Sequence, residues 1–232
     1  HEFATTPATE FAAWLLHCAP TLSEVVVGEN WRFGADAGGT PALLRELGGE
    51  AGLTVTTLPP VVADGDTISS TRIRMEIMKG NLDHAAAMLG RPVSVLGTVV
   101  HGRAIGRTLG FPSANIDPHN EALPPLGVYA VQALVNNRFY DGVMNFGPRP
   151  TFDKEKTRTA ILELHLLDFE GSIYDDSIEA YFIQQLRDEW YFATINELTD
   201  QITKDVEDAR EILKSGGLSA ETRTALAQAW HR

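Results

Sequence analysis

The sequence predicts an α/β segment over residues 1–90, followed by an antiparallel β-barrel with C-terminal helices over residues 91–232. Three observations lead to this fold class. Short apolar runs alternate with capped helical stretches in the first segment, which is typical of βαβ units with a parallel sheet. Beyond Arg91-Pro92, several strand-like runs are joined by turns, as in small antiparallel barrels. A capping signal and an amphipathic helical run then close the chain.

The elements of the first segment are predicted from helix caps and apolar runs. A threonine followed by proline occurs twice, and this pair suits an N-cap and a first helical residue. We expect, in order, a helix opened by Thr6-Pro7, a strand at Val25–Val27, a helix opened by Thr40-Pro41, a strand at Leu53–Leu58, a helix capped by Ser70 and ended by Gly80, and a helix capped by Asn81 and ended by Gly90. Two strands are too few for a complete doubly wound domain. Because His1 is not an initiator methionine, we expect the chain to begin inside that domain.

The second segment supplies the strands of the expected barrel. These strand-like runs are Val93–Val100, Val128–Val135, Phe139–Asn145, Ala160–Leu167 and Ile178–Ile183. Asn136-Asn137-Arg138 indicates a hairpin turn between two of them. Thr194 and Glu197 have the spacing of a capping box, which opens a helix that ends at Gly216-Gly217. A last helix is expected from Ser219 to Arg232.

Composition narrows the class of protein. The 232 residues include 19 Lys and Arg against 31 Asp and Glu, a net charge of −12. This charge argues against non-specific binding to nucleic acid or to an anionic membrane surface. We find neither a long apolar run nor a signal peptide, so we expect no membrane span. The lone Cys18 fits a reducing compartment, and we expect a cytoplasmic location.

The stretch from Gly102 to Asn115 carries the strongest chemical signal. Its three glycines, Gly102, Gly106 and Gly110, allow close backbone approach to an anion, and Arg107 neutralises phosphate. Ser113 and Asn115 offer hard oxygen ligands of the kind that Mg²⁺ prefers. The segment is neither a Walker A loop nor a dinucleotide fingerprint, and glycines between strands also simply form turns.

Several motifs in order resemble those of riboflavin kinases. Gly102–Asn115 is similar to the family's nucleotide loop and Pro-Thr-Ala-Asn motif, with Ser113 in place of threonine. The further matching segments are Leu126–Ala130, Gly142–Phe152, Leu162–Phe169, and Leu186–Glu189 together with Phe192. The resemblance covers roughly residues 91–213 and implies a Greek-key barrel that binds riboflavin and ATP with Mg²⁺ and releases FMN and ADP.

The strand around Glu163 is interpreted first from its alternation. Leu162, Leu164 and Leu166 point to one face, the expected core, while Glu163 and His165 point to the other. A solvent-facing carboxylate is the plain alternative for Glu163. The resemblance implies that Glu163 is the general base that accepts the proton of the ribityl 5′-hydroxyl. We expect His165 to be a packed or solvated strand residue.

The resemblance also assigns roles to the residues around this base. It implies that Ser113 and Asn115 hold Mg²⁺, and that the nucleotide site contains Gly102, Gly106, Arg107, Gly110 and Ser113. It implies flavin contacts from Asn115, Arg187 and Phe192. For Arg187, a surface residue paired with Asp188 or Glu189 is an alternative of equal weight to a flavin contact. Trp190, Tyr191 and Phe192 suit either an aromatic wall for the flavin or core packing, and Asn145 and Arg149 suit loop anchors.

The first segment carries a second, incomplete signal. Val27–Gly34 and Ile68–Arg74 resemble motifs of the adenylyltransferase module of bacterial FAD synthetases, a nucleotidyltransferase with a Rossmann-like fold. A well-capped helix with an arginine is the plain alternative for the second of these. The resemblance makes Asn30, Ser70, Thr71 and Arg72 remnants of that site. Because no His-x-Gly-His turn is present, we expect FMN adenylyltransferase activity only in a longer, bifunctional parent protein.

Two functions from different classes follow. The leading prediction is an ATP- and Mg²⁺-dependent riboflavin kinase that transfers the γ-phosphate to the riboflavin 5′-hydroxyl. The alternative is a flavin- or nucleotide-binding module without catalysis. A nucleic-acid regulator is disfavoured by the net charge of −12, and the sequence leaves the oligomeric state open.

Overall fold

A computed structural model describes residues 5–63, 65–102, 105–148 and 160–229 of the chain. The chain forms two compact units, residues 1–69 and residues 70–232. Within the described ranges, no helix combines the length and the apolar character needed to cross a membrane.

The first unit is a small α/β assembly built on two parallel strands. Its elements are α1 (Ala8–Cys18), β1 (Glu24–Gly28), the short 3-10 helix η2 (Ala35–Ala37), α2 (Pro41–Gly49), β2 (Thr54–Leu58), β3 (Val62–Ala63) and β4 (Asp66–Thr67). Strands β1 and β2 pair in parallel, with Val25 opposite Val55, which confirms the predicted parallel arrangement. The small hairpin of β3 and β4 was not predicted.

Of the two threonine N-caps predicted in this unit, the structure confirms one. The Thr40 hydroxyl accepts a hydrogen bond of 3.2 Å from the Leu43 amide, with Pro41 as first helical residue, as predicted. The prediction for Thr6 is wrong, because α1 begins at Ala8 and its N-cap is Pro7. The Thr6 carbonyl instead accepts a hydrogen bond from the Ala35 amide at 2.7 Å.

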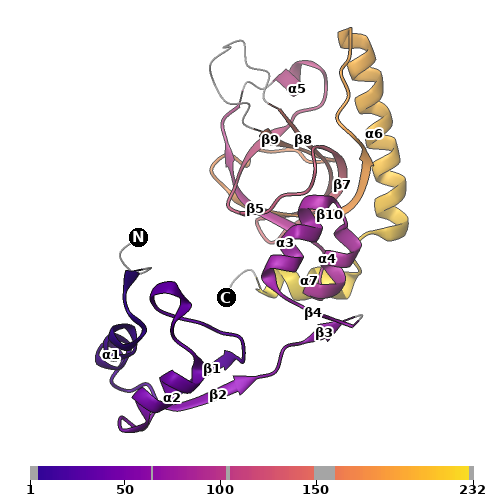
Figure 1. The fold of residues 1–232 in the computed structure, drawn as a ribbon. Coiled ribbons are helices and arrows are strands. Elements are labelled where there is room, and N and C mark those ends of the chain that lie inside the picture. Colours follow the sequence, from indigo (N-terminus) through magenta and orange to yellow (C-terminus); the bar gives the residue numbers. More distant parts are fainter. Residues whose placement is uncertain (1–4, 64, 103–104, 149–159, 230–232) are drawn as a thin grey trace. The chain divides into compact units, whose positions relative to one another are not determined.

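The second unit is a closed six-stranded barrel with helices around it (Figure 1). Its elements are α3 (Ser70–Lys79), α4 (Leu82–Leu89), β5 (Ser94–Val100), α5 (Ile105–Thr108), β6 (Ala114–Pro118), β7 (Gly127–Val135), β8 (Arg138–Pro148), β9 (Ala160–Leu166), β10 (Ser177–Arg187), α6 (Ile195–Gly216) and α7 (Ala220–Ala229). All neighbours are antiparallel, in the order β10-β5-β6-β9-β8-β7, and β10 closes the ring against β7. Because β10 returns beside β7 after three consecutive strands, the barrel contains the predicted Greek key.

The barrel interior is filled by alternate side chains of its strands. Val95, Val99, Leu162, Leu164 and Ile178 are at most 1% exposed and belong to one continuous core. Strands β7 and β8 are joined by Asn136 and Asn137, whose φ angles of 46° and 66° match a two-residue hairpin turn with two left-handed residues. The predicted hairpin and the inward face of β9 are therefore confirmed.

Strand β6 was not predicted, because its residues were assigned to the ligand loop. Only Ile116 of this short strand is buried, and Pro118 ends it. Such a segment lacks the apolar alternation by which a strand is found in sequence. Its pairing with β5 and β9 completes the barrel and places Asn115 on a strand.

Helices α3 and α4 pack on the barrel core, although the βαβ pattern predicts that they belong to the first domain. Ile77 of α3 is 8% exposed and Ala85 of α4 is fully buried, both within the barrel's core cluster. Ser70 is the first residue of α3 and not its N-cap. The compact units therefore divide between residues 69 and 70, and not between the predicted 90 and 91.

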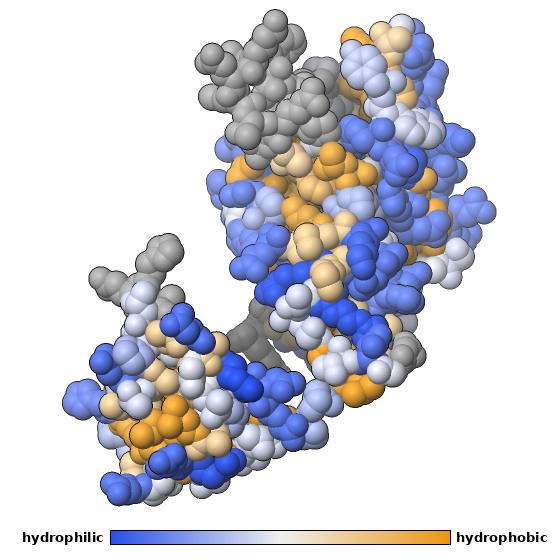
Figure 2. Space-filling model, viewed as in Figure 1, coloured by the Kyte–Doolittle hydropathy of each residue, from blue (hydrophilic) through white to orange (hydrophobic). Residues whose placement is uncertain are grey.

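Helix α6 runs along the outside of the barrel (Figure 1). Ala209 and Leu213 pack against the outward side chains of Val128, Ala130 and Val143 on β7 and β8. The predicted Thr194 cap is confirmed, because its hydroxyl accepts from the Glu197 amide at 3.2 Å. The return bond differs from a capping box, since the Glu197 carboxylate accepts from the Ala193 amide at 3.1 Å and not from that of Thr194. Figure 2 shows a mainly hydrophilic surface over α6, and hydrophobic residues gathered over the barrel. Residues 230–232 of the last predicted helix lie outside the described residues.

Candidate active site

Three polar residues lie side by side on the outer face of the barrel. Glu163 on β9 is paired in register with Asn115 on β6 and with Asn145 on β8. Their side chains share the outer face because those of Leu162 and Leu164 point into the core. Residues far apart in sequence thus form one row across three strands.

The row faces a cavity of about 320 Å³ on the outer side of the barrel. The walls come from the Gly102–Asn115 segment, the outer face of β7 to β9, the end of β10 and the first half of α6. The lining residues are Gly102, Gly106, Leu109, Phe111, Ser113, Asn115, Val128, Val143, Asn145, Ile161, Glu163, His165, Arg187, Glu189, Trp190, Phe192, Leu198, Ile202, Asp205 and Val206. We call this space the outer cavity.

Glu163 is a half-buried carboxylate at the wall of the outer cavity. Burial raises its pKa above the ordinary value of a glutamate, because the charged form is poorly solvated there. No hydrogen bond or ion pair to its carboxylate is found within the described residues. A carboxylate of raised proton affinity that faces a cavity is suited to accept a proton from a bound hydroxyl.

The glycines of the loop lie against the two predicted metal ligands. A Cβ atom at Gly102 would overlap the amide of Asn115, and one at Gly106 would lie 2.9 Å from the Ser113 hydroxyl oxygen. Gly110 is needed for a different reason, because its φ of +89° lies in the left-handed region. The loop also contains the short helix α5, which was not predicted. Arg103 and Ala104 of this loop lie outside the described residues.

His165 ties this loop to the barrel. Its Nδ1 donates a hydrogen bond of 2.7 Å to the Pro112 carbonyl, and the Phe111 ring meets the imidazole edge-on at 5.8 Å. Of the two expected states of His165, packed or solvated, these contacts match the packed one, although the residue also lines the outer cavity. The contact fixes the start of the Ser113 to Asn115 segment next to β9.

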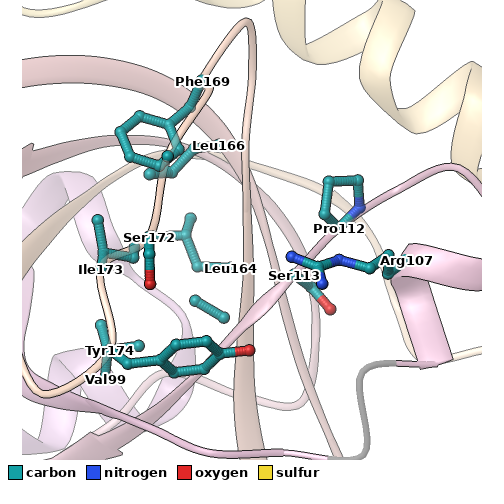
Figure 3. Close-up of a pocket in the computed structure, with 12 residues that line it drawn as sticks. Val99, Arg107, Pro112, Ser113, Leu164, Leu166, Phe169, Ser172, Ile173 and Tyr174 are labelled. Carbon is teal, nitrogen blue, oxygen red and sulfur yellow. The ribbon is translucent and has the colours of Figure 1, made fainter.

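A second cavity of about 290 Å³ adjoins the same loop (Figure 3). Arg107 and Ser113 lie at one side of it, while Leu166, Phe169 and Ile173 form an apolar side. We call it the inner cavity, since Val99 and Leu164 of the barrel core also line it. Ser113 lines both cavities and therefore lies between them.

The Arg187 guanidinium is held by an ion pair that was not predicted. It contacts Asp205 on α6 at 2.8 Å, with side chains only 10% and 4% exposed. Its Nη1 also donates to the Asp188 carbonyl at 3.0 Å. The interpretation of Arg187 as a surface residue paired with Asp188 or Glu189 is therefore wrong. The rings of Trp190 and Phe192 lie 5.0 and 5.6 Å from the guanidinium carbon, within range of cation–π attraction.

Two cavity residues were missed by sequence reasoning. Asp205 of α6 is 3% exposed. In the sequence, its signal is an acidic residue placed between the apolar positions Ile202 and Val206 of an amphipathic helix. Glu189 was considered only as a partner for Arg187. Of the three predicted wall aromatics, Tyr191 is 99% exposed and does not line either cavity, whereas Trp190 and Phe192 line the outer one.

The predicted adenylyltransferase remnants belong to different compact units. Asn30 is exposed in the first unit, whereas Ser70, Thr71 and Arg72 open α3 in the second unit. Each compact unit holds its own part of the motif. Arg149, the other predicted loop anchor beside Asn145, lies outside the described residues.

The fold and the site define a β-barrel domain with two adjoining cavities that meet at a glycine-containing loop. Residues 89–213 match the family model described as riboflavin kinase, and residues 1–72 match the model described as FAD synthetase. The chain belongs to the riboflavin kinase family and carries part of a FAD synthetase domain.

Similar proteins support this membership. The chain is 37% identical over 210 residues to the bifunctional riboflavin kinase/FMN adenylyltransferase of Escherichia coli K12, covering 90% of this chain and 66% of that protein. It is 36% identical over 205 residues to the protein of the same name from Pseudomonas fluorescens, covering 88% of this chain and 65% of that protein. The chain thus spans just under two thirds of the length of these relatives.

A solved structure has the same fold. A crystal structure from Streptococcus pneumoniae, described as a macrolide-efflux protein, superposes with a TM-score of 0.70 at 34% identity. The match covers 90% of this chain and 66% of that chain. It supports the arrangement of elements that the structure shows.

Proposed function

We propose that this chain is a riboflavin kinase that transfers the γ-phosphate of ATP to the 5′-hydroxyl of riboflavin, giving FMN. The observation that carries the proposal is the position of Ser113 where the two cavities meet, with Glu163 in the outer cavity. A phosphate donor in the inner cavity would reach an acceptor hydroxyl in the outer cavity at this point. Kinase chemistry mainly needs such positioning of donor and acceptor.

In this proposal the residues of the outer cavity have two roles, proton transfer and binding of the flavin ring. Glu163 accepts the proton of the 5′-hydroxyl, since its carboxylate has no partner in the part of the chain that the structure describes and burial raises its pKa. Arg187 orders the aromatic wall through Asp205, Trp190 and Phe192. In this proposal that wall receives the flavin ring, because a flat aromatic ligand stacks on such side chains.

The loop fits phosphate and a magnesium ion. Ser113 and Asn115 would hold Mg²⁺ through their side-chain oxygens, and the absent side chains of Gly102 and Gly106 leave the space that these ligands occupy. Bound Mg²⁺ supplies charge neutralisation on the transferred phosphate. Arg107 faces the inner cavity and is placed to neutralise phosphate there.

Product analysis tests the proposal. The chain is incubated with riboflavin, ATP and Mg²⁺, and flavins are separated by chromatography; we expect FMN, and no FMN after chelation of the metal. FAD is not expected, since the chain has no His-x-Gly-His turn. Quenching of riboflavin fluorescence without FMN formation would instead support the non-catalytic binding module.

A further inference from the structure

The outer cavity contains a second carboxylate that the proton transfer does not use. Glu189 follows β10 and lines this cavity together with Glu163. Its carboxylate lies against the backbone of Gly147 on β8, because a Cβ atom at Gly147 would lie 2.7 and 2.8 Å from its two oxygens. The φ angle of Gly147 is not left-handed, so its conformation does not require glycine. Glycine is needed because a larger side chain would collide with the Glu189 carboxylate. The absence of a side chain at Gly147 allows the Glu189 carboxylate to pack directly against strand β8.

The position of this contact relative to Glu163 follows from strand register. Asn145 is paired with Glu163, and Gly147 is paired with Ile161, two residues further along the same face. Two residues of a strand span about 7 Å. Because Ala114 is paired with Leu164, the Ser113 end of β6 lies in the opposite direction. Glu189 therefore lies on the side of Glu163 that points away from the phosphate loop.

The Glu189 carboxylate is open to a ligand. Within the described residues it makes no hydrogen bond, although burial and the nearby charge of Glu163 raise its pKa. Arg187 attracts it, but that guanidinium donates its hydrogen bonds to Asp205 and to the Asp188 carbonyl. The Glu189 side chain is exposed to solvent as well as lining the cavity. An ionised carboxylate can only accept hydrogen bonds, so O–H or N–H groups of a bound molecule would replace the water that solvates it.

We propose that Glu189 is a specificity residue that accepts hydrogen bonds from the secondary hydroxyls of the ribityl chain. The inference rests on the proposed function, which places the terminal hydroxyl at Glu163. From that point the inner hydroxyls of a five-carbon polyol extend along the cavity within the span of about 7 Å between the two strand positions. The N–H group of the flavin ring lies beyond the whole chain and is too distant.

A pair of substrates tests the proposal directly. Wild type and Glu189→Ala are compared on riboflavin and on a flavin whose side chain is 5-hydroxypentyl, which keeps the terminal hydroxyl and lacks the secondary ones. Hydrogen bonds to a charged group contribute about 1.5–3 kcal/mol, so we expect Glu189→Ala to lower kcat/KM for riboflavin about 10- to 100-fold. The value for the hydroxypentyl flavin should change little.

Two further variants complete the design. Gly147→Ala should displace the carboxylate and reproduce the loss on riboflavin, while adding it to Glu189→Ala should cost little more. Glu207→Ala, an exposed residue of α6 outside both cavities, is the matched control and should leave both substrates unaffected.

The outcomes distinguish a failure of the proposed kinase activity from a failure of the proposed role of Glu189. Equal losses on both flavins would overturn the proposal, because they would assign Glu189 a purely structural role. If wild type forms no FMN, the proposed function fails. The role of Glu189 is then tested by fluorescence titration of wild type and Glu189→Ala with each of the two flavins. A wild-type preference for riboflavin that Glu189→Ala abolishes supports it, and unchanged affinities reject it.

Discussion

The residue that determines the chemistry of this site is a glutamate whose surroundings disfavour its charge. Glu163 sits between Asn115 and Asn145 on the outer face of the barrel, half-buried beside the outer cavity. The same burial that raises its pKa makes the deprotonated form a stronger base. Stability and activity therefore oppose each other at this position.

Glu163→Gln should separate these two effects. Loss of the base should lower kcat for FMN formation about 10²- to 10⁴-fold. Glutamine avoids a half-buried charge, so the variant should melt at a higher temperature than wild type near neutral pH. Turnover and thermal unfolding measured on the same preparation check both parts. An unchanged turnover would remove Glu163 from the mechanism.

The pH dependence of these quantities has a definite sign. Because the pKa of Glu163 is raised in the folded state, its stabilising contribution is present at low pH and is lost as pH rises through that pKa. The melting-temperature difference between Glu163→Gln and wild type should therefore shrink on acidification. In the wild type, kcat/KM should fall as pH drops through an apparent pKa above that of an ordinary glutamate. An acid limb at the ordinary value would contradict this.

At the scale of elements, two arginine–aspartate pairs among the described residues join α6 to the strands and loops of the barrel, and their exposure differs greatly. Arg187 and Asp205 are nearly buried, and Gln201 adds a hydrogen bond of 2.8 Å to the same carboxylate. Arg210 and Asp168 form two hydrogen bonds of 2.7 Å at the surface, with side chains 49% and 75% exposed. Water screens the second pair and leaves the first unscreened.

Removing one partner from each pair should have unequal effects. Asp205→Ala leaves a buried guanidinium uncompensated and should lower the free energy of unfolding by about 3–5 kcal/mol. Arg210→Ala, on the same helix, should cost far less. Urea unfolding of the two variants measures the difference. Similar losses for both would show that burial does not decide the strength of these pairs.

The helix pair α3 and α4 is the element that decides the boundary of the folding unit. Ile77 and Ala85 belong to the barrel's core cluster, with partly buried Ile73, Leu82 and Leu89 packed against it. Sequence reasoning assigned both helices to the α/β segment because they follow its βαβ pattern. Local pattern carries no information on which core an amphipathic helix covers.

At the scale of the whole molecule, the division at residue 69 predicts where the chain can be cut. A fragment of residues 70–232 should fold cooperatively and retain FMN formation, because it keeps both helices and both cavities. A fragment of residues 91–232 should unfold at lower denaturant concentration, because it exposes the surface that Ile77 and Ala85 cover. Denaturant unfolding and activity of the two fragments compare the boundaries. Equal stability would favour the boundary at residue 90.

Much of the architecture could be predicted because its signals are local. The Thr40 and Thr194 caps, the Asn136-Asn137 turn and the alternation around Glu163 each depend on residues close together in the chain. These features determined the fold class and the family resemblance, and the structure and the comparisons confirm both.

The rest depended on contacts between residues distant in sequence. Strand β6 is stabilised by its neighbours on either side and not by its own composition. Arg187 finds Asp205, and Glu189 finds Gly147, only because the barrel and α6 bring their segments together. By itself the sequence determined which residues carry chemistry. Tertiary structure alone decided which of them meet, because packing and ion pairing act through space and not along the chain.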